Sequence, residues 1–254
     1  MTTLIYDGTF EGLLTAVFEI YERKLVHVKI LKGEWRNTAL FEDVIKVITD
    51  QTKARRVLKG LKERLSTEGV QRIYVAHLSE MDNCEQALIG YIRHTFDSDQ
   101  NIEEDYGNRF VLKLSEIVQM VRRERHRMEA FVRFQKLSDG TFYATVDSDF
   151  NVLPLLIKHF KDRYADQKWI IYDLRRKYGI YYDLNTVEYM EIDFSRSNQG
   201  GKASIHCEDE GIYQHLWKNY FNSINIPARK NMKLHLRHIA PVLEAFNRKN
   251  LRFF

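Results

Sequence analysis

The sequence predicts an α+β fold, with a helix-rich N-terminal half and a small, mostly antiparallel sheet with packed helices in the C-terminal half. The chain has 254 residues, 44% of them hydrophobic, with only 12 Gly and 3 Pro, so it forms a real core and general disorder is excluded. Apolar residues recur at helical spacing through much of the first 130 residues. Short β-rich runs gather after Arg127 and mostly do not alternate with helices, which favours α+β.

The N-terminal half contains mostly helical patterns. Asp7-Gly8-Thr9 reads as a turn and a helix N-cap, and Asp50 as the cap of a second helix. The pattern leaves open whether 41–48 is a strand or a helix. The other expected elements, in order, are strands at 4–6 and 26–30, helices from Phe10 and after Asp50, one or two helices within 70–96, an exposed acidic loop at 97–107 and a helix at 115–130.

The C-terminal half carries the strand signals. Two apolar runs flank Ser138-Asp139-Gly140 and predict a hairpin of 131–134 with 141–146. The further expected elements are a helix at 152–164, strands at 169–173, 179–183 and 187–194, a turn at 183–186, and closing helices at 211–222 and 230–248. We expect residues 1–114 to form a mainly helical region and 115–254 an α+β region, with one continuous domain as the alternative.

The formal net charge of +4 is the sum of acidic and basic segments whose charges largely cancel. Residues 1–119 carry a net −3, 120–137 a net +4, 138–217 a net −4 and 218–254 a net +7. Both basic blocks also contain aromatic residues. Basic groups neutralise phosphates and aromatic faces stack on unpaired bases, so these blocks favour a nucleic-acid surface. A solvated helix face with a basic tail is the alternative interpretation.

The candidate phosphate-binding residues come from these two blocks. An arginine fits phosphate oxygens bidentately, which a lysine does not. The residues expected to contact DNA or RNA are Arg122, Arg123, Arg125, Arg127, Arg229 and Lys233.

Candidate acid–base residues lie mainly between the two basic blocks. His159 and Arg163 are four residues apart on a predicted helix and share a face that would hold an anion; a helix-end ion-pair cluster is the alternative. Asp173 ends the predicted strand at 169–173, and His126 lies in the first basic block. An enzyme acting on a base or phosphodiester would use these four residues, and it requires that they converge in one cleft.

The sequence contains no Walker motif, GxGxxG, HExxH or GxSxG. His235 and His238 have a spacing that permits a shared metal, but with no carboxylate or thiol nearby in sequence a surface pair is preferred. Cys84 and Cys207 have no CxxC spacing and read as reduced thiols. We therefore expect no metal and no cofactor in this chain.

The chain shows no stretch of about 20 apolar residues and no basic n-region with an apolar h-region at its start. We expect a cytoplasmic protein with no membrane association.

The opening residues, Tyr6-Asp7-Gly8-Thr9-Phe10-Glu11-Gly12, together with 121–134, His159-Phe160 and Pro227-Ala228-Arg229, resemble a bacterial family of probable DNA metabolism proteins. The resemblance spans nearly the whole chain. The family often closes with a Pro-aromatic-Trp segment, whereas this chain has Pro241-Val242-Leu243.

The resemblance implies a partner, because relatives are typically encoded beside a radical S-adenosylmethionine protein suspected of DNA modification or repair, and some are joined to a uracil-DNA-glycosylase-like domain. This chain lacks the CxxxCxxC of a radical-enzyme cluster. The function expected is that of a DNA-metabolism accessory protein that binds nucleic acid beside that enzyme. An enzyme using His159, Arg163 and Asp173, and a protein–protein scaffold without nucleic-acid contact, are the alternatives.

Overall fold

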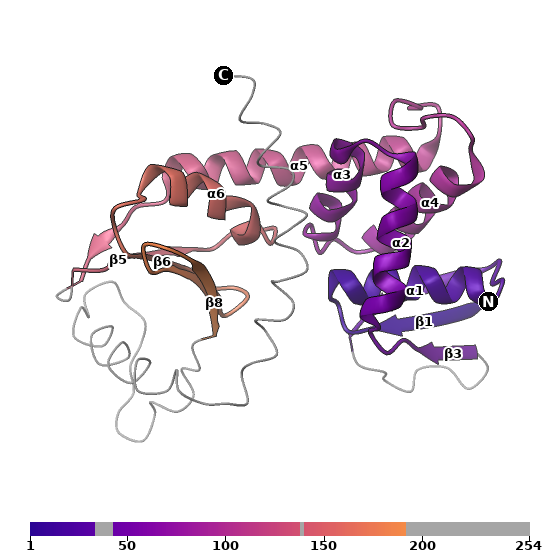
Figure 1. The fold of residues 1–254 in the computed structure, drawn as a ribbon, viewed down its shortest axis with the longest axis horizontal. Coiled ribbons are helices and arrows are strands. Elements are labelled where there is room, and N and C mark those ends of the chain that lie inside the picture. The colour runs from indigo at the N-terminus through magenta and orange to yellow at the C-terminus, as the bar shows by residue number, and fades with distance from the viewer. Residues whose placement is uncertain (34–42, 138–139, 192–254) are drawn as a thin grey trace. The chain divides into compact units, whose positions relative to one another are not determined.

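A computed structural model describes residues 1–33, 43–137 and 140–191, and Figure 1 shows their helices and two small sheets. This confirms the α+β class. The chain divides into two compact units, Met1–Glu124 and Arg125–Phe254, and helix α5 (Arg109–Phe131) belongs to both. The predicted closing helices, Cys207, Arg229, Lys233, His235 and His238 lie outside the described residues.

The first unit is built on a parallel sheet of strand order β2-β1-β3, with β1 at Thr2–Tyr6, β2 at Val28–Lys32 and β3 at Asp43–Lys46. Leu4 pairs with Ile30 on one side and with Ile45 on the other. The segment whose type the sequence left open therefore contains a strand. The central strand β1 is buried from Thr3 to Tyr6, which is typical of a parallel strand covered on both faces.

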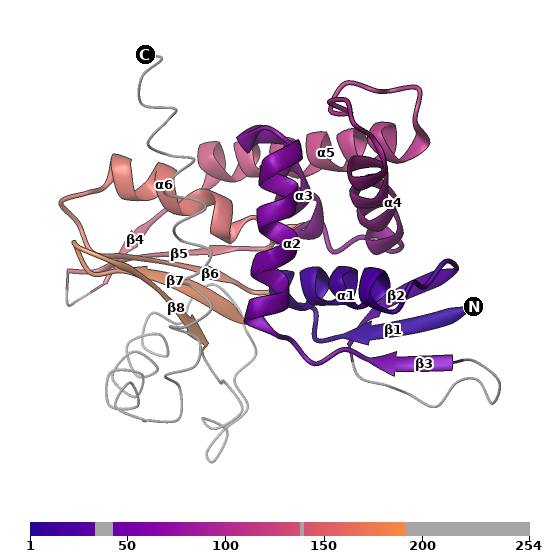
Figure 2. The same cartoon turned by 45° about the vertical axis from the view of Figure 1, so that its right-hand side comes forward.

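Four further helices belong wholly to this unit: α1 (Phe10–Glu22), α2 (Gln51–Arg64), α3 (Thr67–His77) and α4 (Cys84–Asp97). Helix α1 connects β1 to β2 and lies along the sheet (Figure 2). The Thr9 hydroxyl accepts from the Gly12 N–H, and the Asp50 carboxylate accepts from the N–H groups of Thr52 and Lys53. Both predicted N-caps are thus confirmed.

The second unit contains a sheet of order β4-β5-β6-β7-β8. Only β5 and β6 run parallel, and helix α6 connects them, so the sheet is mostly antiparallel as predicted. The Asp183 carboxylate accepts from the N–H groups of Asn185 and Thr186, which confirms the predicted turn between β7 and β8. The elements are β4 (Gln135–Lys136), β5 (Phe142–Val146), α6 (Leu153–Arg163), β6 (Trp169–Asp173), β7 (Tyr178–Tyr182) and β8 (Val187–Glu191).

Two expectations about individual elements were wrong. The segment 97–107 is not simply an exposed loop, because Ile102 and Glu103 are buried and the Glu103 carboxylate accepts from the Ser66 N–H and hydroxyl. Phe131 ends helix α5 instead of starting a strand, and the strand that pairs with β5 begins at Gln135. Strands and helices alternate only locally, at β1-α1-β2 and β5-α6-β6 among the described elements, where a parallel pair needs a crossover connection.

Candidate nucleic-acid interface

The four arginines expected to bind phosphate lie on different sides of α5. The Arg122 guanidinium pairs with the Glu68 carboxylate on α3, and its side chain is 40% exposed. The Arg125 Nε lies 3.2 Å from the Glu129 carboxylate one turn further along the helix. Both guanidinium groups are therefore already engaged by a carboxylate.

Arg123 and Arg127 are the two exposed arginines of this set. They are exposed and lie four residues apart, so they share one face of α5. Ile117 and Val121, on another face of the helix, are buried. Of the predicted phosphate contacts that the structure describes, this pair best fits a role at the surface.

The candidate acid–base residues of the second unit differ in their contacts and in their exposure. The His159 ring meets the Phe160 ring edge-on at 5.0 Å, and its buried Nε2 has no hydrogen-bond partner among the described residues. Arg163 is exposed, with its guanidinium 5.7 Å from the centre of the Tyr164 ring. The His126 side chain is 83% exposed and lies 3.9 Å from Glu129.

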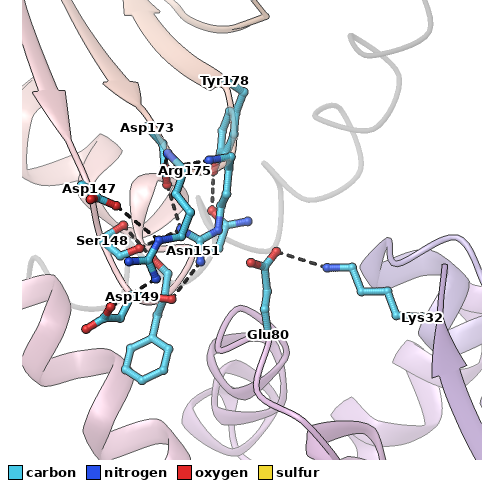
Figure 3. Close-up of polar contacts among 11 residues, drawn as sticks. Lys32, Glu80, Asp147, Ser148, Asp149, Asn151, Asp173, Arg175 and Tyr178 are labelled. Carbon is cyan, nitrogen blue, oxygen red and sulfur yellow. Dashed lines mark hydrogen bonds and ion pairs between the residues drawn. The ribbon is translucent and has the colours of Figure 1, made fainter. Parts of the chain in front are cut away.

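Asp173 is fully buried and already engaged, as Figure 3 shows. Its Oδ2 accepts from Arg176 Nη1 at 2.9 Å, and its Oδ1 accepts from the N–H groups of Arg175 and Arg176 at 2.9 and 3.0 Å. These bonds hold the turn between β6 and β7. A carboxylate with both oxygens occupied is poorly placed to act as a base, which favours a structural role for Asp173.

The same turn is joined to the loop that follows β5. The Arg175 guanidinium lies 3.2 Å from Asp147 Oδ1 and 3.1 Å from Asp149 Oδ1, and the Tyr178 hydroxyl donates to Asn151 (Figure 3). Within the described residues of this unit, no hydrogen bond or ion pair joins any two of His126, His159, Arg163 and Asp173. The convergence that an enzyme would require therefore stays a prediction.

A polar cluster that the sequence did not single out as a site lies at the carboxyl ends of β1 and β3. Asp7 Oδ1 accepts from the N–H and hydroxyl of Thr9 at 2.9 and 2.6 Å, and Asp7 Oδ2 accepts from the Thr49 hydroxyl at 2.8 Å. Strand order 2-1-3 places ligands at this edge in many α/β proteins. Here the Asp7 carboxylate itself lies at the first turn of α1, so it would repel a phosphate.

The signal for this cluster was present in the turn motif that starts at Asp7. Gly12 leaves no room for a side chain, because a Cβ there would collide with Asp7 Oδ1. The side chain of Lys32, at the end of β2, lies 3.2 Å from Glu80 (Figure 3). The contacts of Asp7 with Thr9 and Gly12 show that the opening motif packs the connection from β1 through a turn into α1.

The described cysteine and the described metal-ligating side chains do not form a nucleophilic site or a metal site. Burial raises the pKa of the Cys84 thiol to about 11, so it is protonated and weakly nucleophilic at neutral pH. In residues 1–33, 43–137 and 140–191, no three His, Cys, Asp or Glu side chains gather closely enough to hold a metal ion. None of the helices in those ranges has the length and apolar character needed to cross a membrane.

Comparison with known proteins gives a family but no activity. A family model described as a domain of unknown function (DUF4130) matches residues 82–242. No curated protein matches the sequence. A solved structure, the pGpG-specific phosphodiesterase PggH from Vibrio cholerae, is 11% identical, with 87% of this chain and 98% of that chain covered and a TM-score of 0.38. A score this low does not support a shared architecture or activity.

Proposed function

The chain belongs to the DUF4130 family, whose function is unknown, and we propose that it is a nucleic-acid-binding accessory protein of DNA metabolism. The observation that carries the proposal is the exposed pair Arg123 and Arg127 on one face of α5, within a segment of net charge +4. Two guanidinium groups on one face engage phosphate oxygens and release condensed counterions. The basic residues 218–254 add a net +7 to the same chain.

The partner in this proposal is a radical S-adenosylmethionine enzyme of DNA modification or repair, with the chain delivering DNA to it in the cytoplasm. This part rests on the family resemblance of the opening motif and of the segment 121–134. It fits a chain whose own sequence lacks the cluster-binding CxxxCxxC. No catalytic step is assigned to the chain, because Asp173 is held by Arg176 and the other candidates have no described contact with it.

The double substitution Arg123→Gln and Arg127→Gln tests nucleic-acid binding. We expect the full chain to bind DNA with an affinity that falls steeply from about 50 to 200 mM salt. Loss of two phosphate contacts should lower the slope of log K against log salt by about 1.4 for a single strand or 1.8 for a duplex. Fluorescence anisotropy with labelled DNA measures both.

Lys29→Gln with Lys46→Gln is the matched control, because it removes the same charge from exposed strand positions in the first unit. That control should leave the slope nearly unchanged. Affinity that is absent, or flat across this salt range, would show that the protein does not act through phosphate contacts.

The partner is tested separately by pull-down of the radical S-adenosylmethionine enzyme with and without nuclease. Capture that depends on nucleic acid supports delivery of DNA. Capture that persists after nuclease, together with no DNA affinity of the purified chain, would favour the scaffold function.

A further inference from the structure

We propose that helix α2 and the aromatic rings beside it form a second nucleic-acid contact, one that takes an unpaired strand. We call this the α2 surface and define it by the outward cations Arg55, Arg56, Lys59 and Lys62 and by the rings of Phe18, Tyr21 and Phe96. The inference rests on the proposed function and extends it, because it lies in the first unit and uses none of the arginines of α5.

The first observation is the concentration of charge. The first 119 residues hold 16 Lys and Arg against 19 Asp and Glu, yet α2 alone holds six basic residues and one acidic residue. The rest of this segment therefore carries a large net negative charge, whereas α2 carries a net positive charge. A net −3 for the whole segment conceals that separation of charge.

The second observation is the direction of these side chains. Ala54, Val57 and Leu61 are buried, and they define the inner face of α2. Arg55, Lys59 and Lys62, at positions i, i+4 and i+7, lie on the opposite side and are exposed. At 1.5 Å per residue this row is about 10 Å long, which is about the rise of three nucleotides at 3.4 Å each.

The third observation is the set of aromatic rings along the flank of α2. The Lys53 Nζ and the Arg56 guanidinium lie 5.1 and 4.8 Å from the centre of the Phe18 ring. One turn further along α1, the Tyr21 ring meets the Phe96 ring edge-on at 5.6 Å, and Tyr21 is 41% exposed.

Helix α2 also packs against the Phe96 ring directly. Gly60 is the close contact, because a Cβ there would lie 3.1 Å from Phe96 Cε1. The Arg64 guanidinium lies 5.9 Å from the centre of the same ring. Cationic groups of α2 therefore lie beside both the Phe18 ring and the Phe96 ring.

This combination indicates an unpaired strand. Proteins that bind single strands combine cations that follow the backbone with aromatic rings on which bases stack. The exposed face of Tyr21 is the group available for stacking, and the outward row of α2 supplies the charge. A duplex, whose bases are already stacked, gains nothing from Tyr21.

The chemistry of α2 fits a lipid surface less well. A helix that lies in a membrane interface needs a free apolar face. The apolar face of α2 is buried within the first unit, where α2 packs against α1 and α4. The exposed side presents charge without an apolar anchor.

The test uses the full chain and two variants, and anisotropy with a labelled oligothymidine of about 15 nucleotides and with a duplex of the same length. Arg55→Gln, Lys59→Gln and Lys62→Gln together should weaken single-strand binding about tenfold or more and lower its salt slope by about 2. Tyr21→Leu should weaken single-strand binding about 5- to 100-fold and leave duplex binding unchanged.

The matched control is the triple variant Lys29→Gln, Lys46→Gln and Lys113→Gln, which removes the same charge from other exposed positions of the first unit. It should bind the single strand within about twofold of the parent. Thermal unfolding of every variant confirms that the fold is kept.

The outcomes separate this inference from the proposed function. If the Arg123/Arg127 variant loses DNA binding and the α2 triple variant does not, the α2 surface is overturned and the proposed function stands. If the chain binds no nucleic acid, both are overturned. Equal losses of strand and duplex binding in the α2 triple variant, with no effect of Tyr21→Leu, would overturn the assignment to an unpaired strand.

Discussion

His77, at the end of α3, is neutral at neutral pH. Its pKa is lowered from the ordinary 6.5 to about 4, mainly by burial and also by the nearby Lys32 ammonium, against the smaller opposite effects of Glu80 and Asp7. Its ring lies 5.5 Å from that of Phe10 at the start of α1. Proton uptake by this side chain therefore favours the unfolded chain.

This placement predicts a pH dependence of stability. The unfolded chain binds a proton at His77 as pH falls below about 6.5, whereas the folded chain does so only near pH 4. The free energy of unfolding should therefore fall between these values, by about 3 kcal/mol or less from this group. The variant His77→Gln lacks this contribution.

Urea denaturation of the parent and of His77→Gln should be measured between pH 7 and pH 4, because the pKa of His77 in the folded chain is about 4. The difference between the two proteins isolates the effect of His77, since both contain the same carboxylates. The parent should lose its advantage over His77→Gln as pH falls. A difference that stays constant with pH would show that His77 is not held in its neutral form.

At the scale of elements, the turn between β6 and β7 depends on Asp173. The carboxylate is 0% exposed and binds both the Arg176 guanidinium and two backbone N–H groups. The sequence suggested Asp173 as a base because it is a carboxylate at the end of a predicted strand. Its partner Arg176 lies only three residues further along, but no pattern required that the turn bring the two together.

Substitutions at Asp173 should destabilise the protein in a graded way. Asp173→Ala removes the buried carboxylate from the Arg176 guanidinium and leaves the turn N–H groups unpaired, and should lower the free energy of unfolding by about 3 kcal/mol or more. Asp173→Asn should cost less, because the amide oxygen still accepts from the backbone. Urea denaturation measures both.

The control is Asp162→Asn on α6, whose exposed carboxylate pairs with Lys158. It should change stability by about 0.5 kcal/mol or less, since an exposed ion pair contributes little. Equal effects of Asp173→Ala and Asp162→Asn would contradict the structural role of Asp173.

At the scale of the whole molecule, each unit has one central strand around which its sheet is built. In the described residues, β1 pairs on both sides with parallel strands, and β6 lies between β5 and β7 with all five of its residues buried. By contrast, most of β3 is exposed and β8 lies at the edge of its sheet.

Native-state hydrogen exchange should reflect this difference. Amides of β1 and β6 should exchange most slowly within their own units, because their exposure requires the largest opening. Amides of β3 and β8 should exchange faster. Mass spectrometry or NMR detects the order, and edge strands protected as strongly as the central ones would contradict it.

Much of the secondary structure was predictable because its causes are local. Thr9 and Asp50 cap the helices that follow them, and Ala54, Val57 and Leu61 recur at helical spacing. The charged row of α2 was also visible in the sequence. It was missed because charge was summed over 119 residues, whereas a helix presents its charge over a few turns.

The sequence alone determined the α+β class, the helix caps, the turn at Asp183 and the polarity of charge along the chain, since each depends on residues close together in sequence. Only the tertiary structure decided the parallel pairing of β1 with β2 and β3, the engagement of Asp173 by Arg176 and the rings of Phe18, Tyr21 and Phe96 beside α2. Strand pairs and ring contacts join residues distant in sequence, and their partners are selected by packing of the whole core.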